Sequence, residues 1–221
     1  NRDLTEFVLN ISKEKKLEMY KALIIKSRPE NRTYLYHNYN DNCSTRIRDY
    51  IDDAVNGQLK AATEINRGSS YRKSFLLYTS HTDAVGSALS LLQGPPIDKE
   101  ITMWQEMFIP AVMGEIVKDF SYKNEKGETV SLVQKTNRLN IAQNRKSVPE
   151  KYSPPFIRVI LLTFIISAAI LFLNLRTEMG KIKLFASMNI ITGFILGVTG
   201  SALLFLAAFT DHTYSYYNMN L

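Results

Sequence analysis

Two long apolar segments near the end of the chain stand apart from the mixed pattern that precedes them. Residues 156–175 carry one charge, Arg158, and residues 184–210 carry none. About 20 apolar residues are enough to cross the hydrocarbon core of a bilayer. A domain of this size cannot bury two helices that are apolar all round. We therefore expect a transmembrane helical hairpin, preceded by a proline-rich linker at 147–155.

The charges around these spans predict their orientation. The segment between them, 176–183, carries three basic residues and one acidic residue, whereas 211–221 has no Lys or Arg. Short basic loops stay in the cytoplasm, and long domains are translocated regardless of their charge. We expect the hairpin to turn inside the cell, with residues 1–152 and the tail outside.

Residues 1–146 mix two periodicities, which predicts an α+β domain. Alternating apolar residues over 5–11 indicate a strand, and Ser12 is a suitable cap for a helix running to Ser27. The expected apolar face of that helix consists of Leu17, Tyr20, Leu23 and Ile24. Further helices are expected from Cys43 to near Gly57, over 71–79, over 82–92 and from a Thr102 cap to Phe108, with a β-hairpin over 117–135.

Composition and charge narrow the classes of partner. The 221 residues carry a net charge of +6, but no basic run is longer than two residues. This scattered charge argues against nucleic-acid binding and suits a face near anionic lipid. No His, Cys and acidic residues have the spacing of a metal site, and there is no glycine-rich phosphate loop. We assign no metal and no cofactor.

The stretch HNYNDNCSTRIRD holds the only cysteine, Cys43. Asp41 or Asn42 is a suitable N-cap, which would place Cys43 in the first turn of a helix. Unpaired N–H groups and the positive end of the helix dipole favour a thiolate there, and Arg46 lies one turn on. The spacing of Cys43 to Ile47 and beyond predicts that the thiol faces the body of the domain. The alternative is a small hydrophobic residue that completes this face.

A thiolate nucleophile needs a base, and the chain has three histidines. His37 lies six residues before Cys43 and can fold back toward it or face solvent. His81 is followed by Asp83 at a spacing that cannot face one site on a helix, and His212 lies beyond the second span. His37 is thus the candidate base that the residues themselves offer.

The stretch YLYHNYNDNCSTRIRD, from Tyr34 to Asp49, resembles the bacterial family of the Lnb N-terminal periplasmic domain. The segment GPPIDKEITMWQEMFIP, from Gly94 to Pro110, is similar to a second motif of this family, and so are the C-terminal spans with the ending at 211–221. The DNC-x-T-R-x-R-D pattern is the most specific part. The resemblance covers nearly the whole chain.

This resemblance implies a membrane-bound lipoprotein N-acyltransferase. The family is associated with a circularly permuted papain-like (NlpC/P60-like) thiol fold in the bacterial inner membrane, with the soluble domain on the periplasmic side. It implies a glycerolipid as acyl donor, the N-terminal amine of a lipoprotein as acceptor and a thioester intermediate on Cys43.

The family motif also implies roles for the neighbours of Cys43. Asp41, Asn42, Thr45 and Arg46 match the motif as cap, backbone support and electrostatic partners. The histidine motif of the family precedes the cysteine and does not occur in this chain. The chain, which begins with Asn rather than Met, is therefore expected to be part of a longer protein whose base lies upstream, so that His37 is not the base.

Two other functions share the same residues. A membrane-tethered cysteine peptidase or amidase of cell-wall peptides would use Cys43 in a polar, open cleft. An anchored interaction module without catalysis would keep Cys43 sealed by packing. An apolar channel beside Cys43 would instead favour acyl transfer.

The predicted orientation is tested by placing a cysteine between the spans. The Glu178→Cys variant should resist an impermeant thiol reagent applied from outside, because the basic segment lies inside the cell. The parent chain, which has Cys43 alone, is the control. Ready labelling of position 178 from outside would contradict this orientation.

Overall fold

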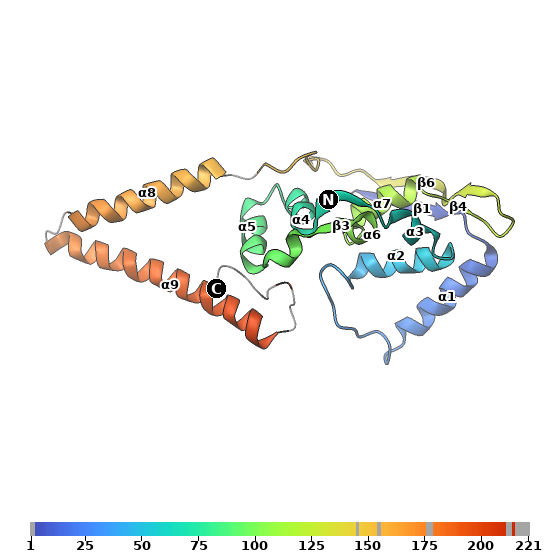
Figure 1. Ribbon diagram of the computed structural model, residues 1–221, viewed down its shortest axis with the longest axis horizontal. Helices are drawn as coiled ribbons and strands as arrows, with labels where there is room; N and C mark the ends of the chain where they lie inside the picture. The colour runs from blue at the N-terminus through green and yellow to red at the C-terminus, as the bar shows by residue number, and fades with distance from the viewer. Residues whose placement is uncertain (1–2, 145, 154–155, 176–178, 211–213, 215–221) are drawn as a thin grey trace. The chain divides into compact units, whose positions relative to one another are not determined.

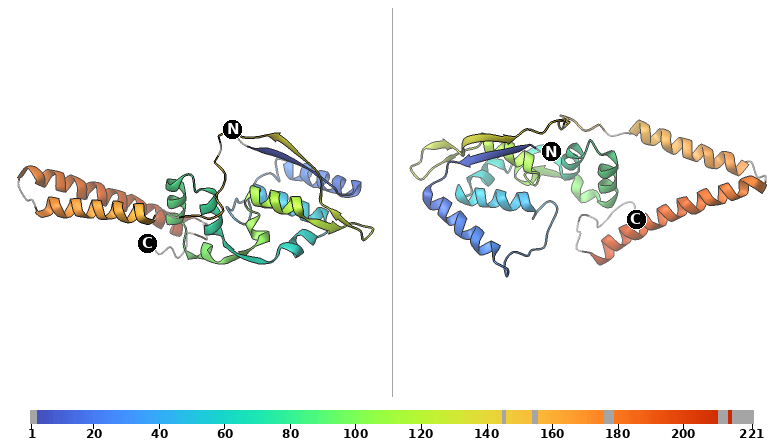
Figure 2. Two further views of the ribbon diagram at one scale, coloured as in Figure 1. Left: turned by 90° about the horizontal axis from the view of Figure 1, so that it is seen from above. Right: turned by 180° about the vertical axis from the view of Figure 1, so that it is seen from behind.

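Two units divide the chain in the computed structural model, which describes residues 3–144, 146–153, 156–175, 179–210 and 214 (Figures 1 and 2). The first unit comprises Asn1–Ser74 and Glu100–Ser147, and the second comprises Phe75–Lys99 and Val148–Leu221. Each unit combines segments that are far apart in the sequence.

The first unit mixes helices and strands, as the sequence predicts. Its strands form three antiparallel pairs: β1 (Leu4–Leu9) with β6 (Val133–Asn140), β2 (Asn66–Ser70) with β3 (Glu100–Thr102), and β4 (Ser121–Lys123) with β5 (Thr129–Ser131). Its helices are α1 (Lys13–Ser27), α2 (Cys43–Ala54), α3 (Gln58–Thr63), α6 (Met103–Glu106) and α7 (Pro110–Asp119), together with the start of α4 (Tyr71–Tyr78).

A small apolar core holds this unit together. The side chains of Val55, Leu59, Met107 and Leu132 are fully buried and pack with Ile51. They come from the end of α2, from α3, from the end of α6 and from the loop before β6. The core therefore fixes the second half of α2 against segments more than fifty residues away in the sequence.

The buried face of α2 differs from the expected one. Cys43 and Ile47 are exposed, and the buried side is composed of Ser44, Thr45, Arg48, Ile51, Asp52 and Ala54. Ser44 and Arg48 donate hydrogen bonds to main-chain carbonyls of the 104–107 segment, and this anchoring fixes the rotation of the helix. The prediction that Cys43 faces the body of the domain is wrong, because polar side chains, rather than the apolar stripe, make the inward contacts.

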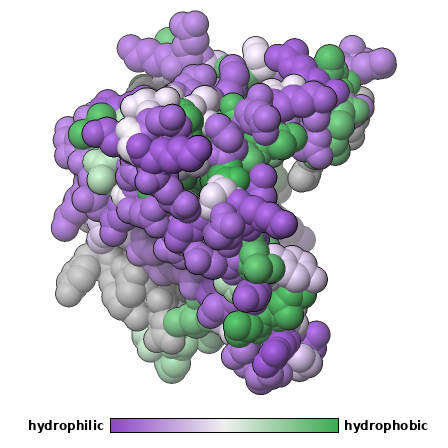
Figure 3. Space-filling view, turned by 90° about the vertical axis from the view of Figure 1, so that its right-hand side faces the viewer, coloured by the Kyte–Doolittle hydropathy of each residue, from purple (hydrophilic) through white to green (hydrophobic). Residues whose placement is uncertain are grey.

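Helix α1 begins where the sequence predicts but packs differently. The Ser12 side chain accepts a hydrogen bond from the Lys15 N–H, which confirms the cap. No residue of α1 is buried. The expected apolar face, Leu17, Tyr20, Leu23 and Ile24, is exposed by 45 to 62%. Figure 3 views the side that carries α1 and shows green apolar side chains exposed among purple hydrophilic ones.

The segment from 102 to 135 is partly as predicted. Thr102 caps α6 in a capping box with Gln105. Residues 117–119, expected in a strand, form the end of α7 instead. Proline is favoured at the first position of a helix, and Pro110 begins α7 there. The apolar pattern alone did not indicate this helix. The strands of the β4–β5 hairpin are accordingly shorter than expected.

The second unit is helical in its described part. It holds most of α4, α5 (Asp83–Leu92), the 3₁₀ turn η1 (Pro95–Asp98), and the long helices α8 (Phe156–Leu175) and α9 (Met179–Phe209), which pack against each other. Within the described residues one stretch is long and apolar enough to cross a membrane, Lys183–Phe209. The described apolar stretch of α8, Val159–Phe172, is shorter, so the first of the two predicted spans stays a prediction.

Several predictions concern residues outside the described part. These are the prolines at 154 and 155, the turn at 176–178, His212 and the tail apart from Tyr214. The expected orientation of the hairpin therefore also remains a prediction.

The N-terminus of α2 supplies a stability test. Asn42→Ala removes the side chain that caps two N–H groups, so we expect the free energy of unfolding to fall by about 2 kcal/mol. Urea unfolding of the full chain in detergent, followed by the fluorescence of Trp104 beside α2, measures it. Asn42→Ser keeps a capping oxygen and should lose less. A loss as large in Asp41→Ala would contradict the assignment of Asn42 as the cap.

Candidate functional site

Cys43 is the first residue of α2, as predicted, and its side chain is exposed. Of the two expected caps, Asn42 is the one that forms. Its side-chain oxygen accepts from the N–H groups of Ser44 and Thr45 at 2.8 and 2.9 Å, and the Thr45 hydroxyl oxygen accepts from the Asn42 N–H at 2.8 Å. This reciprocal capping box defines where the helix begins, and hence where the thiol stands.

Both neighbours of Cys43 are anchored to the body of the unit. The buried Asn42 amide donates to the carbonyls of Asn38 and Phe108 at 2.9 and 3.1 Å. The buried Ser44 hydroxyl donates to the Met107 carbonyl at 2.8 Å. The backbone of Cys43 is therefore held on both sides while its side chain faces outward.

The cap leaves one donor beside the thiol. Asn42 satisfies the N–H groups of Ser44 and Thr45, and its carbonyl accepts from the Arg46 N–H at 3.2 Å. Within the described residues, no acceptor is bonded to the backbone N–H of Cys43. Unpaired N–H groups at a helix N-terminus favour a nearby negative charge.

Arg46 and Asp41 form an ion pair beside this turn. Arg46 donates from Nε and Nη2 to the two Asp41 carboxylate oxygens at 2.6 and 2.9 Å, and its guanidinium carbon lies 3.4 Å from the ring centroid of Tyr34. The hydrogen bonds from Arg46 hold the pKa of Asp41 below its usual value. Because Asp41 balances the charge of Arg46, the main positive potential at Cys43 comes from the helix terminus.

Arg48 is an anchor that the sequence reading did not identify. Its guanidinium donates to the Trp104 carbonyl at 2.9 Å and lies 3.9 Å from the Trp104 ring centroid. It also pairs with Asp49, a neighbour rather than a residue one turn away. The order of charged residues along α2 gave no signal for this contact, which depends on the distant α6.

His37 organises the turn before α2. Its Nδ1 accepts from the N–H groups of Tyr39 and Asn40 at 3.2 and 3.0 Å, and its main chain pairs with that of Asp41. In this arrangement the imidazole lone pair faces the backbone, so the remaining nitrogen carries the proton in the neutral ring. His81 lies between α4 and α5 in the second unit.

Tyr36 is a further neighbour that sequence reasoning missed. Partial burial raises the pKa of its phenol, and the charge of a Cys43 thiolate raises that pKa further. Tyr36 is thus within electrostatic reach of the thiol as a neutral hydroxyl donor. No spacing rule marks a tyrosine in the loop before a helix as part of such a site.

An apolar groove lies on the same side of α2. It has a volume of about 410 Å³ and is lined chiefly by Phe7, Leu9, Met19, Leu23, Ile47 and Met113. Ile47 follows Cys43 by four residues, so both side chains lie on one face of α2.

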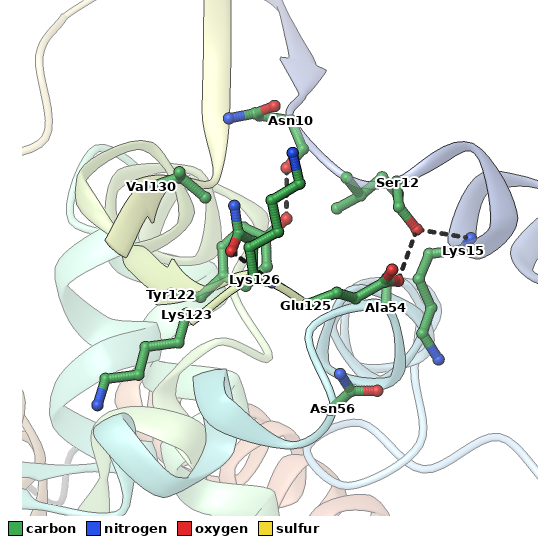
Figure 4. Close-up of a pocket in the computed structure, with 12 residues that line it drawn as sticks. Asn10, Ser12, Lys15, Ala54, Asn56, Tyr122, Lys123, Glu125, Lys126 and Val130 are labelled. Carbon is green, nitrogen blue, oxygen red and sulfur yellow. Dashed lines mark hydrogen bonds between the residues drawn. The ribbon is translucent and has the colours of Figure 1, made fainter. Parts of the chain in front are cut away.

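A second cavity lies elsewhere in the unit and does not involve Cys43. It has a volume of about 250 Å³ and lies between the start of α1 and the β4–β5 hairpin (Figure 4). Ser12 donates to Glu125 at 3.0 Å, and the Tyr122 hydroxyl donates to the Asn10 carbonyl at 2.6 Å. These bonds tie the hairpin to α1 and explain the mixed polar lining.

Comparison with known proteins gives one match. Residues 1–75 match the family model of the Lnb N-terminal periplasmic domain, a range that contains α1, the capped turn at Cys43 and α2. No curated protein and no solved structure matches the chain. Together with the apolar helix α9, the match indicates a membrane protein with a periplasmic domain. Residues 1–75 are therefore similar to the Lnb N-terminal periplasmic domain, as the resemblance around Cys43 predicted.

Proposed function

We propose that the protein is a membrane-bound, cysteine-dependent acyltransferase. It moves an acyl chain from a glycerolipid to the N-terminal amine of a bacterial lipoprotein through a thioester on Cys43. The observation that carries the proposal is an exposed cysteine at a capped helix N-terminus, on the same face of α2 as an apolar groove.

Helix α2 supplies the electrostatics of the nucleophile. The positive end of the helix dipole and the unpaired N–H groups favour a negative charge at the first turn, where Cys43 lies. Asn42 and Thr45 maintain this geometry by fixing the first turn. Asp41 and Arg46 act on the adjoining loop, which their ion pair ties to α2 and to Tyr34.

The first half-reaction forms the thioester. The Cys43 thiolate attacks the carbonyl carbon of an acyl ester, and the resulting oxyanion accepts a hydrogen bond from the Cys43 N–H. The ester C–O bond then breaks, and the leaving alkoxide takes up the proton that a histidine base removed from the Cys43 thiol. The products are an acyl thioester and a lysolipid.

The second half-reaction transfers the chain. The neutral amine of the lipoprotein attacks the thioester carbon, the C–S bond breaks and the thiolate returns as the leaving group. The amine proton passes to the base, so an amide forms with no net oxidation or reduction. We place the base in a histidine outside residues 1–221, because the Nδ1 lone pair of His37 faces two backbone N–H groups.

The architecture supports a papain-like arrangement. In such thiol folds a cysteine opens a helix that packs on the body of the domain, and α2 has this placement. We propose that the unit is a portion of a permuted papain-like domain, held at the periplasmic side of the inner membrane by a helical hairpin formed by α8 and α9.

The alternatives fit the site less well. A cell-wall peptidase or amidase needs polar groups along its cleft to bind a peptide main chain, whereas the groove on the Cys43 face of α2 is lined mainly by apolar side chains. A purely structural cysteine would be sealed, and Cys43 is exposed. Acyl transfer needs an apolar site for the acyl chain and an exposed thiol, and both are present on this face of α2.

The proposal predicts how changes at Cys43 and His37 affect N-acylation. Cys43→Ala should abolish N-acylated lipoproteins, and Cys43→Ser should be nearly as inactive, because a serine hydroxyl does not form an anion at neutral pH. His37→Ala should keep substantial activity. Mass spectrometry of lipoproteins from cells that depend on the full-length enzyme measures each product.

Membrane levels and the fluorescence of Trp104 control for folding. Wild-type levels of product from Cys43→Ala would overturn the proposed mechanism. Complete loss of product in a folded His37→Ala protein would instead identify His37 as the base.

A further inference from the structure

The apolar groove on the Cys43 face of α2 is itself a candidate ligand-binding site. We infer that it is the binding site for the acyl chain of the glycerolipid, and that its volume limits the length of chain that the protein accepts. This inference rests on the proposed function for the identity of the donor. The groove itself is a feature of the first unit alone.

The lining favours an alkyl chain over a peptide. Of the side chains in contact with the groove, only those of Thr5 and Tyr50 carry a polar group. A buried peptide main chain leaves costly unpaired N–H and C=O groups unless the walls supply partners, whereas an alkyl chain has none to satisfy. The apolar lining therefore matches a hydrocarbon.

The volume of the groove also suits a hydrocarbon chain. It is about 410 Å³. Small-molecule sites occupy roughly 300–1,000 Å³. The volume of the groove is thus on the scale of one small ligand. Met19 and Met113 supply flexible walls that adapt to a chain without a fixed shape.

The surroundings of the groove suit a lipid headgroup. Leu23 belongs to α1, whose lysines outnumber its two glutamates and give it a positive charge. Apolar side chains beside these lysines, among them Leu17 and Tyr20, are exposed by 51% and 62%. Lysines attract the phosphate groups of anionic lipids, and neighbouring apolar groups enter the boundary of the acyl region. The same chain carries the apolar helix α9.

Two exposed positions allow the groove to be filled without disturbing the core. Leu23 is 47% exposed and Ile47 is 53% exposed, so Leu23→Trp and Ile47→Trp add volume from the rim. Ile24→Trp is the matched control, since Ile24 is 45% exposed on the same helix but does not line the groove.

Photocrosslinking tests the site without turnover. The full chain carrying Cys43→Ala is placed in vesicles of phosphatidylethanolamine and phosphatidylglycerol with a trace of phosphatidylethanolamine that has a diazirine on one acyl chain. We expect crosslinked peptides from α1 and α7. Leu23→Trp or Ile47→Trp should reduce this crosslinking about tenfold, because excluding two methylene groups weakens binding by about that factor. Ile24→Trp should leave it unchanged.

The outcomes test the acyl-chain site and the acyltransferase reaction separately. Equal crosslinking in Leu23→Trp, Ile47→Trp and the control would overturn the acyl site, as would displacement of the probe by an apolar peptide but not by excess glycerolipid. In catalytically intact protein, the two groove variants should shift N-linked chains on lipoproteins toward shorter lengths. An unchanged length profile, with activity still dependent on Cys43, would refute the groove and leave the acyltransferase proposal standing.

Discussion

The reciprocal hydrogen bonds between Asn42 and Thr45 are the constraint on which the site depends. They fix the residue at which α2 begins, and the amide of Asn42 continues the contact to the Phe108 carbonyl on the far side of the core. A helix that began one residue later would make Cys43 the cap residue and would remove Asn42 from the capping position. The position of the thiol is therefore set by a buried polar network and is independent of packing around the sulfur.

That network also explains why the site is open. Ser44, Thr45 and Arg48 take the inward positions of α2 because their polar groups reach fixed partners, and Cys43 and Ile47 are turned outward as a consequence. The exposure of both the Cys43 thiol and Ile47 thus follows from one rotation of one helix, and it suits the lipid substrate that we propose.

The sequence predicted local structure better than contacts. The caps Ser12 and Thr102 were identified because capping depends on residues within one turn, and the first turn of α2 was placed correctly for the same reason. Helix α7 was missed because Pro110 was not recognised as its first residue. The inward face of α2 was predicted wrongly, since apolar periodicity does not register hydrogen bonds from Arg48 to a carbonyl 56 residues away. The contacts of Arg46 with Asp41 and Tyr34, and the position of Tyr36 near Cys43, depend on the conformation of the loop before α2. Residue spacing alone does not predict this conformation.

The central claim is that Cys43 carries the acyl chain during transfer, and the intermediate itself can be observed. The full-length protein is reconstituted with glycerolipid in the absence of a lipoprotein acceptor, digested and analysed by mass spectrometry. The account predicts an acyl mass added to the peptide that contains Cys43, released by neutral hydroxylamine and discharged when an acceptor peptide with a free N-terminal amine is added. An unmodified Cys43 peptide in a preparation that still acylates the acceptor would contradict it.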